Sequence, residues 1–196
     1  IGTAVQPITT IPEVAEVNYG GNRYPIVLVG TGRYLGDPDV LDTTTTHSVY
    51  GVRDPLDSTG WADVRASMVE QTLTNVSTDH DNNANTPAIE TRKVSRNAVN
   101  WSDTQVAGWY IDLPDDGERV AVGMSLAYTT LTVASVVPAN DVCSGSGYSW
   151  IYDFDISTGS YVSTQAATQT AGYKRLVATM GINTLQFDDN GSSSSG

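Results

Sequence analysis

Oxygen-bearing side chains recur through residues 79–90 at the spacing of a calcium-binding loop. Such a loop, of about twelve residues, supplies oxygen ligands from its first, third, fifth, seventh and last positions. Those positions hold Asp79, Asp81, Asn83, Asn85 and Glu90. Ala84, however, stands where such loops have glycine, and no flanking helices are predicted. A plain solvated turn would have the same Asn and Asp content, so both interpretations stay open.

A second acidic cluster, Asp37, Asp39 and Asp42, follows a glycine-rich turn. Closely spaced carboxylates can gather a cation, and turn-forming aspartates have the same spacing. The glycines at positions 30, 32 and 36 are one residue too widely spaced for a dinucleotide-binding turn, and Pro38 stands where its helix would run. A tight exit from a strand, with close backbone approach, therefore explains these glycines better.

The chain offers little material for catalysis. His47 and His80 are its only histidines, and neither lies in a nucleophile motif such as G-x-S-x-G. Cys143 is the only cysteine, so no disulfide forms within the chain, and zinc-ligand spacing is absent. Cys143 either pairs outside this segment or is a small buried thiol. We expect no catalytic residue and no organic cofactor.

The composition indicates an acidic, strand-rich protein. The 196 residues include 22 Asp and Glu against 10 Lys and Arg, giving a net charge of -12, which would repel a polyphosphate backbone. We therefore expect no nucleic-acid partner. No apolar run reaches the length of a membrane span, about eighteen residues, and the first residues lack a signal-peptide layout. We expect a fragment of a longer secreted protein.

Short apolar runs separated by turn residues predict β-strands. The predicted strands cover residues 24–29, 48–52, 108–113, 119–122, 126–137 and 149–154. Gly, Pro and Asp predict hairpin turns at residues 20–22, 114–117 and 155–159. Residues 61–71 fit a short helical turn, but Val69, Gln71, Leu73 and Asn75 also fit an alternating strand, so both interpretations stay open. This pattern favours an antiparallel sandwich, barrel or propeller over a fold with parallel crossovers.

Two segments are predicted to lie outside the core. Residues 77–88 are polar and contain a proline, which indicates an exposed loop. Residues 188–196 are rich in Ser and Gly and should form a flexible tail or linker. Residues 1–187 are therefore expected to form one domain or part of one.

Six segments, in order, resemble the C-terminal propeller of the PilC/PilY family of type IV pilus proteins. They are QPITTIPEV (6–14), VLVGTGRYLGDPDV (27–40), HSVYGVRD (47–54), MVEQTL (68–73), GWYIDLPDDGERV (108–120) and SVVPANDVCSGSGYSWIYDFDISTG (135–159). The GTGRYLG and GWY-x-DLP-x-x-GER pieces are the most specific. Together they cover most of the chain up to residue 159.

The resemblance implies an all-β fold, an antiparallel partial β-propeller, with residues 1–187 as the C-terminal portion of a seven-bladed domain. It implies a secreted protein at the pilus tip that acts in fimbrium biogenesis, opposes retraction, and supports cell adhesion and twitching motility. Expected partners are pilins, minor pilins, the remainder of the same propeller, and a host or abiotic surface. The family's calcium-binding loop is expected upstream of this chain, so its metal role is not transferred to Asp79. No Arg-Gly-Asp tripeptide occurs here.

Two other functions deserve comparison. Ten tyrosines and four tryptophans could stack on sugars, as in a carbohydrate-binding surface module. The Asp-x-x-Thr-Gly turn at 155–159 suggests a quinoprotein-like dehydrogenase propeller, which needs a repeated tryptophan pattern. The four tryptophans show no fixed period. A non-catalytic pilus module is therefore preferred.

Overall fold

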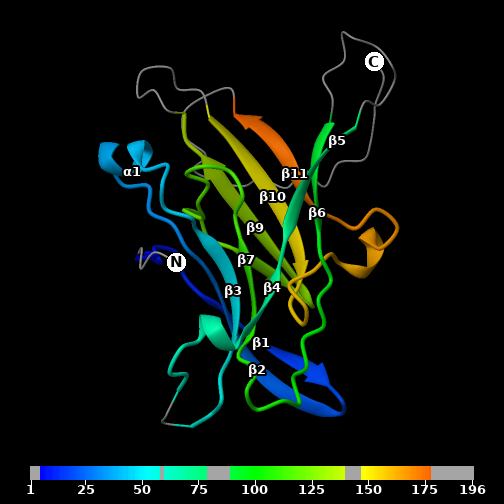
Figure 1. Ribbon diagram of the computed structural model, residues 1–196. Coiled ribbons are helices and arrows are strands. Elements are labelled where there is room, and N and C mark those ends of the chain that lie inside the picture. The colour runs from blue at the N-terminus through cyan, green and yellow to red at the C-terminus, as the bar shows by residue number, and fades with distance from the viewer. Residues whose placement is uncertain (1–4, 58–59, 79–88, 140–146, 178–196) are drawn as a thin grey trace, which may run out of the picture.

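Two β-sheets account for most of the chain between residues 5 and 177. The computed structural model describes residues 5–57, 60–78, 89–139 and 147–177. Within them, one sheet has five strands in the order β1-β2-β3-β7-β4, and the other has six in the order β5-β6-β11-β10-β9-β8 (Figure 1). The first sheet comprises β1 (Glu13–Tyr19), β2 (Asn22–Gly30), β3 (Ser48–Arg53), β7 (Gly108–Asp112) and β4 (Met68–Gln71). The second comprises β5 (Leu73–Thr78), β6 (Ile89–Val94), β11 (Thr170–Val177), β10 (Gly147–Asp155), β9 (Thr130–Val137) and β8 (Ser125–Ala127).

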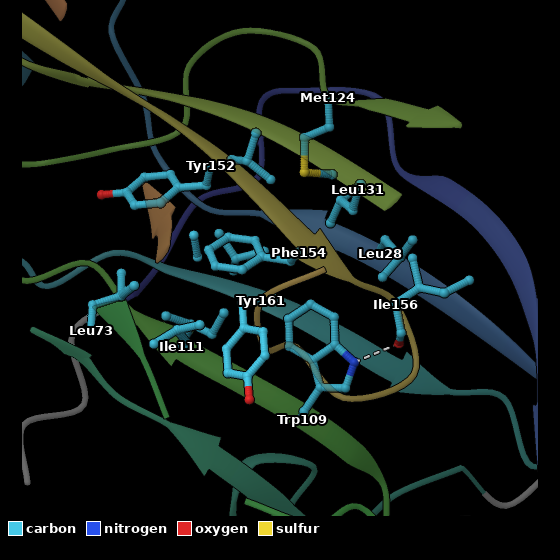
Figure 2. Packing of buried hydrophobic residues seen from close by; sticks show 14 of the residues in the cluster. Leu28, Leu73, Trp109, Ile111, Met124, Leu131, Tyr152, Phe154, Ile156 and Tyr161 are labelled. Carbon is cyan, nitrogen blue, oxygen red and sulfur yellow. Dashed lines mark hydrogen bonds between the residues drawn. The ribbon is translucent and has the colours of Figure 1, made fainter. Parts of the chain in front are cut away.

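The hydrophobic core is shared by the two sheets. Along β10, Trp150, Tyr152 and Phe154 are fully buried, and the residues between them are half-buried, as strand alternation requires. Figure 2 shows Tyr152 and Phe154 of the second sheet beside Ile111 and Trp109 of the first. The Trp109 and Phe154 ring centroids are 6.5 Å apart. Burial of each such side chain stabilises the fold by roughly 1.5–3 kcal/mol.

A single residue, Thr72, separates β4 of the first sheet from β5 of the second. The corner is fixed by Gln71, which is buried at the end of β4. Its Nε2 donates hydrogen bonds to the carbonyls of Asn97 (2.7 Å) and Thr158 (2.8 Å). Its Oε1 accepts a hydrogen bond from Ser95 Oγ at 2.7 Å. Both ends of the amide are therefore used to hold the passage between the sheets.

Most predicted strands are confirmed. The runs at 24–29, 48–52, 108–113 and 149–154 correspond to β2, β3, β7 and β10. The run at 126–137 is two strands, β8 and β9, because the chain reverses at Tyr128, whose φ is 55°. The strand predicted at 119–122 is wrong, since Arg119 makes only an isolated bridge to Val136. Strands β1, β6 and β11 were not predicted as runs, because charged and polar residues interrupt their apolar positions.

The described structure is mostly β, as predicted, and the predicted antiparallel pairing needs one correction. Strands β4 and β7 pair in parallel, with Met68 opposite Gly108. The other strand pairs among the described residues are antiparallel. The exception arises because β3 occupies one side of β7 as an antiparallel neighbour, and the chain passes through residues 54–67 before β4 joins the other side.

Two of the three predicted hairpin turns are confirmed, and the third is wrong. Gly20 and Gly21, with φ of 58° and 81°, form the tight turn between β1 and β2, as predicted. Residues 155–159 also reverse the chain, so that Phe154 bridges Tyr161. The hairpin predicted at 114–117 is wrong, because the chain crosses from β7 toward the second sheet, where residue 119 meets β9.

The helices are short. Residues 61–71 contain the 3₁₀-helix η1 (Arg65–Ser67) followed directly by β4, so each of the two interpretations holds for one part. A second 3₁₀-helix is η2 (Ser163–Gln165). The α-helix α1 (Asp37–Leu41) was not predicted, and it accommodates Pro38 in its first turn, where a missing N–H is tolerated. In the described ranges, the helices lack the length and apolar character needed to cross a membrane.

Candidate functional site

The two most specific sequence motifs lie against each other in the structure, and Arg119 joins them. Arg119 follows β7 and is almost completely buried. Its Nε donates to Gly117 O at 2.8 Å, and its Nη2 donates to Asp42 O at 2.5 Å. Its Nη1 donates to Arg33 O at 3.1 Å and also to the carbonyl of Asp39. The guanidinium thus holds the loop from Arg33 to Asp42 in place through hydrogen bonds to main-chain oxygens, which do not depend on the side chains of the loop.

Close backbone contact explains the glycines of the first motif. A Cβ on Gly30 would lie 2.6 Å from Val120 Cγ1, and a Cβ on Gly32 would lie 2.6 Å from Val120 O. Gly32 also has a φ of 155°, a conformation that side chains disfavour. Val120 N donates to Thr31 O at 2.9 Å, which holds the two segments together. The interpretation of these glycines as sites of close approach is confirmed for Gly30 and Gly32, whereas a Cβ on Gly36 would make only an ordinary contact, 3.7 Å from Pro38 Cδ.

The carboxylates of the second acidic cluster anchor their own loop. Asp39 Oδ1 lies 2.6 Å from Arg33 Nε, and its Oδ2 accepts a hydrogen bond from Leu35 N at 2.9 Å. The bond from Leu35 N, followed by that from Arg33, lowers the pKa of Asp39. Asp42 accepts hydrogen bonds from the hydroxyls and main-chain N–H groups of Thr44 and Thr45. These bonds, that from the Thr45 hydroxyl first, also lower its pKa. Asp39 and Asp42 therefore act as turn-forming aspartates.

A second buried arginine, Arg92 of β6, lies between two carboxylates. Its Nη1 is 2.6 Å from Glu118 Oε2, and its Nη2 is 2.5 Å from Asp115 Oδ1. Its Nε donates to Asn75 Oδ1 at 2.7 Å, and its guanidinium carbon lies 3.8 Å from the centroid of the Trp150 ring. Asp115 and Glu118 follow β7 of the first sheet, whereas Arg92 belongs to the second. The cluster is therefore an electrostatic tie between the sheets.

Tyr152 completes this cluster. Its hydroxyl donates to Glu118 Oε1 at 2.6 Å and accepts a hydrogen bond from Arg92 Nη1. Burial raises the pKa of the Tyr152 phenol, and the charge of Glu118 raises it further. Burial disfavours the charge on Arg92, but Tyr152, Glu118 and Asp115 outweigh this effect and raise its pKa. The arrangement keeps Arg92 charged and Tyr152 neutral, which suits a structural role.

A third arginine, Arg65 of η1, lies on the outer face of the first sheet. Its Nη2 is 2.5 Å from Asp112 Oδ2, and its Nη1 donates to Tyr50 OH at 2.7 Å. Its guanidinium carbon lies 3.9 Å from the Tyr110 ring centroid. Tyr50 OH in turn donates to Gln6 Oε1 at 2.5 Å, which ties the N-terminal arm to β3. Sequence reasoning missed Arg65, because only the strand register brings Tyr50 opposite Tyr110.

The histidines show no catalytic arrangement in the described part of the chain. His47 is 3% exposed, and its Nδ1 has no hydrogen-bond partner there. Burial lowers the pKa of His47, and the nearby charge of Arg119 lowers it further. His47 and Arg119 line a pocket of about 220 Å³ together with Arg33. His80 lies outside the described residues.

Of the five candidate calcium ligands, only Glu90 lies among the described residues. Asp79, Asp81, Asn83 and Asn85 lie outside the described residues, as does Cys143. Glu90 lies on β6, and its Oε2 is 2.7 Å from Lys174 Nζ on β11. No group of three or more His, Cys, Asp or Glu side chains suited to a metal occurs among the described residues. Calcium binding by residues 79–90 stays a prediction.

Comparison with solved structures identifies the type of fold. No family model matches the chain. The structure superposes on the crystal structure of the Pseudomonas aeruginosa PilY1 C-terminal domain with a TM-score of 0.66 and 23% sequence identity, covering 88% of this chain and 40% of that one. The fold is thus a mostly β domain of the type found in that structure.

A curated relative gives the same result from sequence. The chain is 29% identical to the type IV pilus biogenesis factor PilY1 of Pseudomonas aeruginosa (strain UCBPP-PA14), in an alignment that covers 81% of this chain and 15% of that protein. By sequence and by structure, the chain is homologous to the C-terminal domain of PilY1. The resemblance inferred from the six segments is confirmed. The chain spans 15% of the length of this relative.

Proposed function

We propose that the chain is a non-catalytic module of a type IV pilus biogenesis factor, displayed at the pilus tip on the bacterial outer surface. In this role it supports pilus assembly, adhesion and twitching motility. The single observation that carries the proposal is the homology to PilY1, a protein named for type IV pilus biogenesis. Pilins, minor pilins and a host or abiotic surface are the proposed partners.

The way the motif residues are used supports a module for display. The polar atoms of Arg119, Asp39 and Asp42 are hydrogen-bonded to main-chain groups and side chains of these loops. Arg92 and Glu118 are buried together between the sheets. Groups that bind each other in this way hold loops in fixed positions, which suits recognition by surface shape.

We propose further that the two sheets are neighbouring blades of a β-propeller. The shared core of Trp109 and Phe154 is what packed blades require, and the larger size of the solved PilY1 domain leaves room for more blades. The N-terminal arm supports this as well, because Val5, Ile8 and Ile11 are exposed apolar residues. The remainder of the propeller is the proposed partner of this arm.

Calcium binding is a separate proposal that rests on the spacing of Asp79, Asp81, Asn83, Asn85 and Glu90. Calorimetric titration of the chain with calcium should show a site that is weakened by Asp81→Asn. Asp153→Asn, on β10, is the matched control. Equal binding by the two variants would contradict this assignment, whereas the pilus proposal would be unaffected.

Deletion of the coding region for this chain, within the full-length gene, tests the pilus proposal. We expect the deletion strain to lose surface pili in electron micrographs and to lose twitching zones on agar. The same deletion in a strain whose pili cannot retract separates the two roles, because pili return if the module opposes retraction and stay absent if it is needed for assembly. Normal piliation and twitching, with the truncated protein still secreted, would contradict the proposal.

A further inference from the structure

An open groove of about 480 Å³ lies beside the segment that connects β3 to β4, including η1. Its volume falls in the range of small-ligand sites, roughly 300–1,000 Å³. It is lined by residues of this connection together with Thr104 and Gln105, which precede β7. None of the six resembling segments contributes to it. The groove is therefore independent of the motif contacts described above.

The apolar wall of the groove contains an aromatic ring held in a fixed orientation. Trp61 is half-buried, and its Nε1 donates to Arg53 O at 2.9 Å. Pro55, Ala62 and Ala66 are the apolar residues that line the groove with it. Because the polar edge of the indole is already hydrogen-bonded, the ring can offer a ligand only its apolar face. An indole face packs well against a flat apolar ligand surface.

The groove is also lined by polar groups that are free to bind a ligand. The side chains of Ser67, Thr104 and Gln105 make no hydrogen bond to other residues of the described chain. Asp63 uses Oδ1 to accept a hydrogen bond from Ala66 N at 3.1 Å, and its Oδ2 has no such partner there. The groove thus combines one apolar ring face with hydroxyl, amide and carboxylate groups. These groups can donate to and accept from a ligand that carries several hydroxyls.

The charge of the groove narrows the class of ligand. The carboxylate of Asp63 lines the groove, and its described lining residues include no Lys or Arg. Anionic ligands such as phosphates and sialic acid would be repelled, because none of these lining residues carries a positive charge to pair with them. A neutral pyranose matches the site, since its C–H face is apolar and its rim carries hydroxyls. We propose that this groove binds a neutral sugar, with the ring stacked on Trp61 and its hydroxyls bonded to Asp63 and Gln105.

This inference rests on the proposed function in one respect: if the chain acts in adhesion, neutral glycans are the class of ligand that it binds. Binding itself is measured on the chain in solution. Failure to bind sugar would therefore leave the piliation test of the previous section intact. Equally, normal piliation of the deletion strain would leave sugar binding standing.

The experiment titrates the chain with methyl glycosides of glucose, galactose and mannose, with sialyllactose as the acidic comparison. Saturation-transfer NMR detects contact with the sugar ring protons, and tryptophan fluorescence follows saturation. The fluorescence change reports on Trp61, because Trp101, Trp109 and Trp150 are at most 1% exposed. We expect saturable millimolar binding of at least one neutral glycoside and none of sialyllactose. Absence of saturable binding to all three glycosides, or equal binding of sialyllactose, would overturn the inference.

Four variants assign the binding to the groove. Trp61→Ala should weaken it by about tenfold or more, whereas Trp61→Phe, which keeps a ring face, should weaken it less. Gln105→Ala changes an exposed side chain and should weaken binding without altering the melting temperature. Tyr128→Ala removes a fully exposed tyrosine elsewhere and is the matched control. If Gln105→Ala binds sugar as the unmodified chain does, or if Tyr128→Ala loses it equally, the groove is not the site.

Discussion

Arg92 and Glu118 form an ion pair of 2.6 Å in which both side chains are completely buried. Arg92 belongs to the second sheet, and Glu118 follows β7 of the first. A buried charge is costly unless it is paired and hydrogen-bonded, and here Asp115, Tyr152 and Asn75 supply the remaining partners. The stability of the contact between the sheets therefore depends on each partner being present.

Loss of the Glu118 carboxylate should destabilise the whole domain. Glu118→Gln leaves Arg92 with fewer negative partners and should lower the free energy of unfolding by about 3–5 kcal/mol, because the remaining charge is buried. Urea unfolding followed by tryptophan fluorescence measures this. The control is Glu16→Gln, which removes an exposed pair with Arg23 and should cost less than about 1 kcal/mol. Equal effects of the two substitutions would show that burial does not decide the cost.

Replacement of Gly32 should loosen the contact between the two specific motifs. Gly32→Ala places a Cβ 2.6 Å from Val120 O and forces alanine into a φ of 155°, so we expect a loss of about 1–3 kcal/mol. Gly123→Ala is the control, since a Cβ there meets nothing within 4 Å. Thermal melts of both variants give the comparison. A stable Gly32→Ala variant would mean that the two segments can separate freely.

Arg119 should not tolerate lysine. Its guanidinium donates to four carbonyls, and an ammonium with its single nitrogen cannot reach all of them. We expect Arg119→Lys to increase hydrogen exchange of the main-chain N–H groups in residues 33–42. Arg33→Lys, at a half-exposed position, is the matched control and should change exchange much less. Unchanged exchange in Arg119→Lys would contradict the anchoring role.

Mild acid should weaken the fold partly through His47. Burial lowers the pKa of His47 below its ordinary value of 6.5, so the unfolded chain binds a proton at a higher pH than the folded chain does. Stability therefore falls as the pH drops below about 6.5. The carboxylates of Asp39 and Asp42 lose their stabilising effect only at lower pH, below their ordinary value of 3.8.

The measurement is the free energy of unfolding at about pH 7.5 and about pH 5.5, by urea titration. We expect the difference between the two values to be smaller for His47→Gln than for the unmodified chain. His80 is present in both proteins and cancels in the comparison. A difference of the same size in both would show that His47 does not contribute to the acid sensitivity.

Local patterns predicted the strands with regular apolar alternation and the tight turn at Gly20 and Gly21. They failed where the chain crosses between sheets. Residues 119–122 have strand-like composition, but Arg119 is committed to the carbonyls of another loop. The parallel pairing of β4 with β7 could not be predicted from local patterns either, because strand pairing depends on which strand edge is free after folding.

The candidate sites show the same division. The spacing of the glycines at 30 and 32 correctly indicated close backbone approach, since that property belongs to the residue itself. Arg92 and Arg65 were not singled out, because their partners lie 26 and 47 positions away in the sequence, at Glu118 and Asp112. Only the resemblance of whole segments pointed to the fold type that the comparisons confirm.

The single residue between β4 and β5 has a mechanical consequence. Because Gln71 is hydrogen-bonded to the carbonyls of Asn97 and Thr158, the short connection does not allow the two sheets to rotate as separate bodies. A tensile load applied to one sheet would pass directly into the other through Thr72. Such a module would transmit force as one stiff unit, a useful property in a structure that is pulled.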